Sequence, residues 1–216
     1  MIDIYFVRHG QTDGNLAKRH QAEHTKLTPE GREQVRQTAQ WAKEINPTHL
    51  LSSRHVRALQ TADIIAQEVD LIPETHDLFI ELKRPDSIYG HRHRSPRAMF
   101  YLMRWYLGFA GDHGQDGKGE SYEAFRERLD DAQKQLKSLP DGSRAIVVSH
   151  AVFIGFMARH LCDKDPVAIP DAFSLFHNML HLHNGSYTHV RFDPDAHEGT
   201  CAWELVSYNN HEHIKV

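Results

Sequence analysis

An apolar run near the N-terminus, Ile2 to Val7, ends abruptly in Arg8-His9-Gly10, and this junction constrains the fold more than any other feature. β-Branched and aromatic residues in such a run predict a buried strand followed by a loop. Open α/β sheets bind their ligands just beyond the carboxyl ends of their strands. A histidine at that place, between an arginine and a glycine that lets the backbone approach a ligand, suits a nucleophile facing an anion.

Three distant segments repeat this pattern of an apolar run followed by side chains with useful chemistry. The run His49 to Leu51 leads into Ser53 to Ala62, which contains Arg57 and begins a helical pattern. Leu78 to Glu81 is a short strand-like run that ends in a carboxylate, and Ala145 to His150 is a β-branched run that ends in a histidine. These are the residue types that phosphoryl transfer through a histidine requires.

With these segments the chain resembles the histidine phosphatase superfamily, which includes the phosphoglycerate mutases, from Arg8 to about position 178. The resemblance implies a metal-independent phosphatase with no cofactor, in which His9 becomes a phosphohistidine that water then hydrolyses. Helical and strand signals alternate along the chain, which favours an α/β fold: a mostly parallel sheet covered by helices on both faces. The length suits a single domain over residues 1–216.

The resemblance also implies the phosphate-binding residues. Arg8 and Arg57 would hold the phosphoryl group through planar, multidentate hydrogen bonds that lysine does not reproduce. Arg57 is preferred over Arg54, because the family pattern has three residues between a serine, here Ser53, and Arg-Ala-x-Gln-Thr-Ala. His150 would donate a hydrogen bond to the phosphoryl group, and Asn15 would touch it.

Glu81 occupies the family position of the acid that protonates the leaving oxygen. A partly desolvated carboxyl group suits general acid catalysis. Asp77, Asp86 and Glu120 are near in sequence and are the alternatives, although Glu120, beside a predicted helix cap, is interpreted as structural.

Residues 83–120 differ in character from the rest of the chain, with arginines, a Met- and aromatic-rich stretch and a Gly-rich end. We expect this helical and loop insertion to form a lid over the active site, with Arg84 and Arg92 contacting the substrate. A helical hairpin packed on the sheet edge, with a solvated basic face, is the structural alternative.

Capping and turn signals set the expected elements. Thr28-Pro29 and Ser121 are typical of helix starts, whereas Pro140-Asp141-Gly142 is typical of a helix end. Helices are expected at 29–44, 55–68, 122–139 and 150–161, and late strands at 174–182, 187–192 and 203–206.

Composition narrows the functional class. A formal net charge of −4 argues against a nucleic-acid partner, and no apolar stretch is long enough to span a membrane. Cys162 and Cys201 lack CxxC spacing and are expected to be free thiols in a reducing cytoplasm. The expected partner is a small phosphorylated substrate, while the oligomeric state stays open.

Two rival functions deserve a test. The first is a mutase-type phosphotransferase, but Leu82-Lys83-Arg84-Pro85 lacks the Arg-His-Tyr-Gly that follows the acid in true mutases. The second is a metal-binding module or non-catalytic scaffold, suggested by the pairs His91/His93, His181/His183 and His211/His213. No acidic or cysteine partners complete a tetrahedral set around these pairs, and the reacting positions are all filled.

Overall fold

The computed structural model describes residues 1–109, 119–162, 179, 181–197 and 199–215. In this part of the chain a six-stranded sheet has the order β3-β2-β4-β1-β5-β6. The first four strands in that order pair in parallel, and β5 and β6 are antiparallel. The bounds are β1 Ile2–Arg8, β2 His49–Ser53, β3 Glu74–His76, β4 Arg144–Ser149, β5 Tyr187–Phe192 and β6 Trp203–Asn210. The mostly parallel sheet predicted from the sequence is confirmed.

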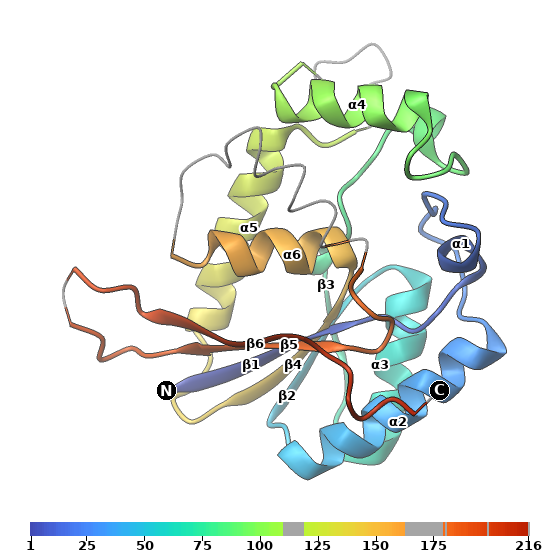
Figure 1. The fold of residues 1–216 in the computed structure, drawn as a ribbon. Coiled ribbons are helices and arrows are strands. Elements are labelled where there is room, and N and C mark those ends of the chain that lie inside the picture. Colours follow the sequence, from blue (N-terminus) through green and yellow to red (C-terminus); the bar gives the residue numbers. More distant parts are fainter. Residues whose placement is uncertain (110–118, 163–178, 180, 198, 216) are drawn as a thin grey trace.

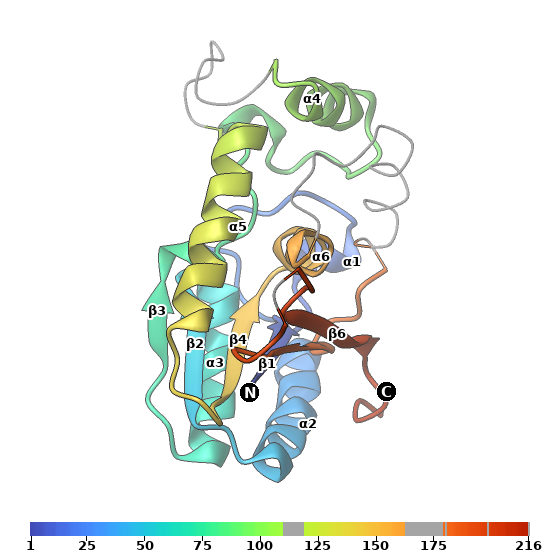
Figure 2. The same ribbon diagram turned by 90° about the vertical axis from the view of Figure 1, so that its left-hand side faces the viewer.

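Helices cover both faces of this sheet, as expected (Figures 1 and 2). The helices α2 (Pro29–Ile45) and α3 (Val56–Val69) pack on one face, and α5 (Tyr122–Lys137) and α6 (Ala151–His160) pack on the other. The remaining helical elements are α1 (Asp13–Leu16), the 3-10 helices η1 (Asp77–Phe79) and η2 (Asp86–Ile88), and α4 (Pro96–Tyr106). In both views α4 lies at the end of the molecule away from the sheet.

Alternate residues of the central strands enter two separate cores. In β4, Ala145 and Val147 face the core under α5 and α6, whereas Ile146 and Val148 face the core under α2 and α3. A strand buried on both faces is apolar throughout, which explains why these segments were recognisable as continuous apolar runs.

The helix boundaries follow their predicted caps. The side chain of Thr28 accepts from the backbone N–H of Gly31, with proline at the first helical position, and Ser121 accepts from Ala124 N–H. Asn46 ends α2 in the left-handed conformation at φ 50°. These capping bonds satisfy backbone N–H groups that have no partner inside the helix.

The strand expected at 78–81 is wrong. Strand β3 ends at His76, and the apolar residues that follow form η1 instead. Phe79 and Ile80 are fully buried, and the Phe79 carbonyl accepts from the Ser149 hydroxyl across 2.7 Å. A short apolar run fits a buried turn as well as a strand, so periodicity could not separate them. Of the strand expected at 174–182, residues 174–178 and 180 lie outside the described residues, and β6 extends beyond 206 to Asn210.

The expectation of free thiols is also wrong. Cys162, just after α6, forms a disulfide with Cys201 in the β5–β6 connection, with a Cα–Cα distance of 5.5 Å. The spacing of the two cysteines in the sequence does not predict this bond, because Cys201 reaches the end of α6 only once β5 and the turn after it have folded. Disulfides are rare in reducing compartments, so this bond does not support the predicted cytoplasmic location, which stays a prediction. Within the described residues, no helix has the length and apolar character needed to cross a bilayer.

Candidate active site

The two histidines singled out in the sequence meet at one edge of the sheet. Arg8 pairs with Ser149 in the parallel ladder of β1 and β4, and the backbone N–H of His9 donates to the Ser149 carbonyl across 3.0 Å. Parallel neighbours end at the same edge, so the residues that follow them are brought side by side. The ring centroids of His9 and His150 are 5.2 Å apart.

His9 is held as a neutral imidazole with a defined tautomer. Its Nδ1 lies 2.8 Å from the Gly10 carbonyl, which only accepts, so Nδ1 carries the proton. Its Nε2 accepts a hydrogen bond from Nε of Arg57 across 3.2 Å and therefore presents a lone pair. Burial, followed by the charges of Arg57 and Arg8, holds the pKa of His9 well below its usual value. The nucleophilic form therefore exists at neutral pH and below.

The two predicted arginines converge on this imidazole. Arg57, at the start of α3, also donates to the carbonyl of Ala22 across 3.0 Å. Arg8 donates from its Nη1 to the carbonyl of Leu182, and its Nε is buried with no hydrogen-bond partner among the described residues. Burial lowers the pKa of each guanidinium to about 10, so both stay charged at neutral pH.

His150 occupies the N-cap position of α6, although its side chain makes no capping bond. Its Nε2 lies 2.8 Å from the hydroxyl of Ser53, whereas its Nδ1 is buried with no partner in the described part of the chain. Burial and then Arg57 keep its pKa well below the usual value. Buried polar atoms without partners are costly, so Nδ1 here and Nε of Arg8 mark places for the oxygens of a bound anion.

Asn15 belongs to the short helix α1 and lines the pocket. Its Oδ1 accepts from the backbone N–H of Thr12 at 3.1 Å and from Nδ2 of Asn184 at 3.1 Å, which fixes the side chain. The Asn15 amide nitrogen has no hydrogen bond to a described residue, so it is the part of this side chain that is left to donate to a ligand.

Glu81 caps α6 from a distant loop. Its Oε1 accepts from the N–H groups of Leu82 (2.9 Å) and Phe153 (3.2 Å), and its Oε2 accepts from Val152 (3.3 Å). The last two donors belong to the first turn of α6, where N–H groups have no intrahelical partner. These bonds fix the carboxyl group at the wall of the pocket.

The alternative acids lie elsewhere. Asp77 is exposed and pairs with Nε of Arg54 at 3.1 Å. Glu120 is buried and pairs with Nε of Arg128 at 2.7 Å, so its role is structural. Asp86 does not line the pocket, and Glu81 is the carboxylate that does so among the described residues. Arg54 is likewise outside the pocket lining.

A cavity of about 990 Å³ lies at this site, and the fully buried His150 is not part of its lining. Arg8, His9, Asn15, Arg57 and Glu81 line it, and the insertion contributes its predicted contacts, Arg84 and Arg92. The cavity is much larger than a phosphoryl group needs, so a substrate with a sizeable remainder fits.

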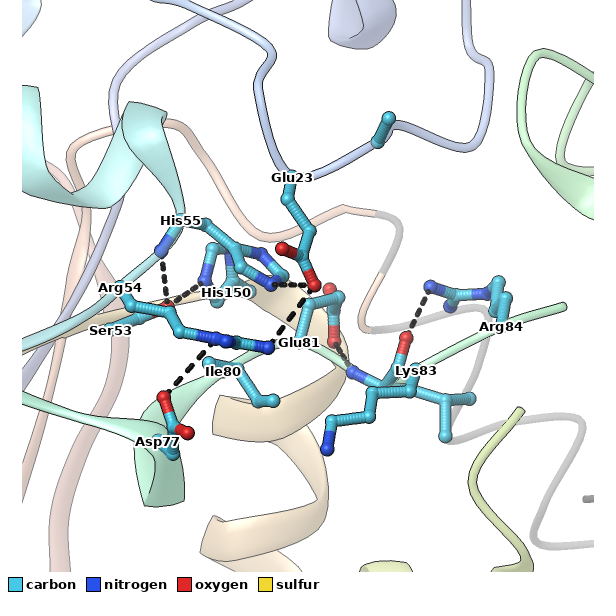
Figure 3. Close-up of polar contacts among 12 residues, drawn as sticks. Glu23, Ser53, Arg54, His55, Asp77, Ile80, Glu81, Lys83, Arg84 and His150 are labelled. Atoms are coloured by element: carbon cyan, nitrogen blue, oxygen red, sulfur yellow. Dashed lines mark hydrogen bonds and ion pairs between the residues drawn. The ribbon is translucent and has the colours of Figure 1, made fainter. Parts of the chain in front are cut away.

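Sequence reasoning missed His55, which packs behind the site (Figure 3). Its Nδ1 accepts from Nη2 of Arg57 across 3.2 Å, and its ring centroid is 4.8 Å from that of His150. A guanidinium only donates, so the remaining proton is on Nε2, which faces Oε1 of Glu23 at 3.8 Å. Burial, then Arg57, lowers the pKa of His55 to about 3. The sequence feature that could have identified His55 is its place two residues before Arg57, just after an apolar run.

The histidine pairs that suggested the metal-binding alternative are not arranged as a metal site. Among the described residues no group of three or more His, Cys, Asp or Glu side chains is arranged to hold a metal ion. His183 and His211 stack with their centroids 3.7 Å apart at the pocket rim, together with His181.

Comparisons with known proteins extend over nearly the whole chain. A model of the histidine phosphatase superfamily, branch 1, matches residues 4–210. The probable phosphoglycerate mutase GpmB of Escherichia fergusonii is 32% identical over 163 residues, which are 72% of this chain and 72% of that protein. A mutant phosphoserine phosphatase from Entamoeba histolytica in complex with phosphoserine has a TM-score of 0.78 and 23% identity over 100% of both chains. A mycobacterial glucosyl-3-phosphoglycerate phosphatase has a TM-score of 0.72 and 23% identity, covering 97% of this chain and 99% of that one.

Proposed function

The chain belongs to the histidine phosphatase superfamily, and from this membership we propose that it hydrolyses phosphate monoesters through a phosphohistidine on His9. The observation that carries the proposal is the state of His9. Its Nε2 lone pair is aimed at the charged Arg57, while Nδ1–H is fixed on the Gly10 carbonyl. A neutral imidazole among cations is a nucleophile placed where a phosphate would bind.

The two steps of the reaction follow from this geometry. Nε2 of His9 attacks phosphorus, the ester P–O bond breaks, and the leaving oxygen takes a proton from Glu81. Water then attacks the phosphohistidine, the P–N bond breaks, and Glu81 takes the proton of the water. Arg8 and Arg57 neutralise the charge on the phosphoryl oxygens, and Nδ1–H of His150 donates to one of them.

A mutase is the second candidate, because a relative is named a probable phosphoglycerate mutase. A mutase must transfer the phosphoryl group to a second hydroxyl before water reaches it. The residues after Glu81, Leu82-Lys83-Arg84, do not follow the mutase pattern, and the cavity is large. Both features favour release of free phosphate.

The remaining parts of the proposal concern the setting of the site. The insertion predicted at 83–120 serves as a lid whose Arg84 and Arg92 contact the substrate, and both line the cavity. Residues 110–118 of this insertion lie outside the described residues. The substrate is a small phosphorylated molecule, nucleic acid is not a partner, and the protein works in the cytoplasm without a metal.

Trapping the intermediate tests the proposal. Brief incubation with a labelled phosphate ester should leave acid-labile label on the wild-type protein, together with release of free phosphate. His9→Ala should lose both, whereas His197→Ala, an exposed site on the β5–β6 hairpin, should keep both. Wild-type turnover in His9→Ala would overturn the nucleophile, and transfer without phosphate release would favour the mutase. A panel of phosphorylated metabolites then finds the substrate.

A further inference from the structure

The cavity carries far more positive charge than one phosphoryl group requires. Its described lining includes seven Lys and Arg side chains and one carboxylate, that of Glu81. The whole chain has a formal net charge of −4, so this excess belongs to the cavity and not to the protein. Arg8 and Arg57 face His9, and a cleft lined by one sign of charge attracts an oppositely charged ligand. The other five cations, which include Arg84, line the rest of the cavity.

Among the positively charged residues of the cavity lining outside the His9 site, Arg84 is the buried one. It is only 9% exposed, and its guanidinium donates to the Leu82 carbonyl across 3.3 Å. No carboxylate of the described residues lies within ion-pair distance of it. The buried Arg128, in contrast, has Glu120 at 2.7 Å. A buried charge without a counter-ion is costly, so its retention beside an open cavity indicates a ligand that supplies the counter-charge.

Two imidazoles stand beside this guanidinium. His20 and His93 both line the cavity, and their ring centroids are 4.7 Å apart. Backbone hydrogen bonds fix them together: His20 N–H donates to the His91 carbonyl (3.0 Å) and His93 N–H to the Lys18 carbonyl (2.9 Å). The segment after α1 and the insertion thus form one continuous wall of the cavity.

The protonation of these rings suits a hydrogen-bonding role. Burial, and then the charge of Arg84, lowers the pKa of His20 to about 2 and that of His93 to about 4. Both rings are neutral at neutral pH, and a neutral imidazole has one N–H donor. The ring N–H of His93 is bonded to the Arg19 backbone, so His20 is the ring whose N–H is left for a ligand. Arg84 supplies the positive charge, His20 supplies a directed N–H donor, and His93 packs against the His20 ring.

We infer that Arg84, His20 and His93 form a second anion-binding subsite, which selects phosphate monoesters that carry a carboxylate or a second phosphate. The inference rests on the proposed function, because that function fixes which end of the substrate lies here. Glu81 protonates the leaving oxygen, so the rest of the substrate lies beyond Glu81. In Figure 3, Glu81 stands between His150 and Arg84. The leaving group therefore extends toward Arg84, with Arg92 at the rim of the same cavity.

Matched pairs of substrates test this inference directly. 3-Phosphoglycerate and glycerol 3-phosphate share one ester and differ in a carboxylate, and glucose 1,6-bisphosphate and glucose 1-phosphate differ in a second phosphate. The wild-type protein should favour the anionic member of at least one pair by about tenfold or more in kcat/KM, the range expected for a hydrogen bond to a charged group. The favoured pair identifies the source of the anion.

Variants then assign the preference to residues. Arg84→Gln should bring the ratio of kcat/KM within the favoured pair close to one, and His93→Gln or His20→Gln should reduce it less, because these rings carry no charge. Arg104→Gln is the matched control, since this exposed arginine of α4 donates to the Phe109 carbonyl and does not line the cavity. Thermal denaturation of each variant verifies folding.

The outcomes separate the two proposals. Hydrolysis of all four esters without preference for either anionic member overturns the subsite and leaves the phosphatase intact. A preference that Arg84→Gln, His20→Gln and His93→Gln all leave unchanged also overturns it. If no ester, including an aryl phosphate, releases phosphate, the proposed function itself fails.

Discussion

Nε of Arg57 donates a hydrogen bond to Nε2 of His9 across 3.2 Å. The guanidinium therefore contacts the lone pair of the imidazole that is proposed as the nucleophile. Burial is the largest cause of the lowered pKa of His9, and the charge of Arg57 comes next, because a positive neighbour disfavours imidazolium. An entering phosphoryl group has oxygens that compete for the guanidinium. Arg57 therefore helps to keep His9 neutral in the free protein, and in the proposed reaction it binds the phosphoryl oxygens.

Replacing Arg57 should slow the reaction far more than it weakens folding. Arg57→Lys keeps a positive charge but loses the planar fork that reaches His9, Ala22 and His55 together. We expect kcat/KM to fall by a factor that corresponds to ~3 kcal/mol, as for the loss of one preorganised donor. Steady-state kinetics with an aryl phosphate measures this.

Arg54 provides the control within the same motif. It pairs with Glu23 at 3.3 Å and Asp77 at 3.1 Å near the surface, outside the cavity. Exposed pairs of this kind contribute little, so Arg54→Ala should change kcat/KM by no more than about threefold. The opposite order of the two effects would transfer the phosphate-binding role to Arg54.

His55 should act by positioning Arg57. His55→Leu removes the acceptor at Nδ1, which leaves Nη2 of Arg57 without a partner and loosens the guanidinium. A displaced binding group costs roughly tenfold to a hundredfold in rate. His55→Asn places an amide oxygen near the lost Nδ1 and should restore most of the rate. Equal losses in both variants would show that the ring itself, packed on His150, is what matters.

Strand and helix placement could be predicted from residues that act locally. Thr28 and Ser121 cap their helices, and β4 shows its two buried faces as an unbroken apolar run. The order of the strands brings His9 and His150 together, and the family motifs located Arg57.

The features that sequence reasoning missed depend on contacts between distant segments. His55 matters because Arg57 and Glu23 come together around it. The Cys162–Cys201 bond spans 39 residues and needs the β5–β6 connection in place. The pairing of His20 with His93 needs the insertion to fold back on the segment after α1, and nothing in either segment alone indicates this.

The stability of the protein should fall steeply on mild acidification. Burial is the main cause that lowers the pKa values of His9, His150, His55, His20 and His93 in the folded state. The unfolded chain takes up these protons as the pH falls through the ordinary histidine value of 6.5, whereas the folded chain does not. Each such imidazole then lowers the free energy of unfolding by about 1.4 kcal/mol per pH unit.

Denaturant titrations between pH 7.5 and about 4.5 measure this slope. The range stays above the ordinary pKa of carboxylates, so the imidazoles dominate. His20→Gln should make the slope shallower, because one proton fewer is taken up on unfolding, and the exposed His197→Gln should leave it unchanged. A stability that is flat over this range would contradict the buried, neutral state of these rings.

Glu81→Gln separates proton donation from binding. An alkoxide is a poor leaving group and needs the acid, whereas nitrophenolate is stable as an anion and hardly needs it. General acid catalysis contributes about a hundredfold or more. We expect a loss of this size in kcat/KM for sugar or glycerol phosphates and a much smaller loss for the aryl ester, provided that phosphorylation of His9 limits the rate.

The contacts of Glu81 predict what the substitution does to the fold. Glutamine retains one acceptor for the N–H groups of Leu82 and Phe153, but its NH2 group then faces the N–H of Val152. The first turn of α6 loses one capping bond, a cost of about 1 kcal/mol that thermal denaturation detects. Glu81→Asp, which keeps the acid but shortens its reach, is the matched variant. Equal losses for the alkyl and aryl esters would make Glu81 a positioning residue or the base of the second step, because a residue that only protonates the leaving oxygen must distinguish these leaving groups.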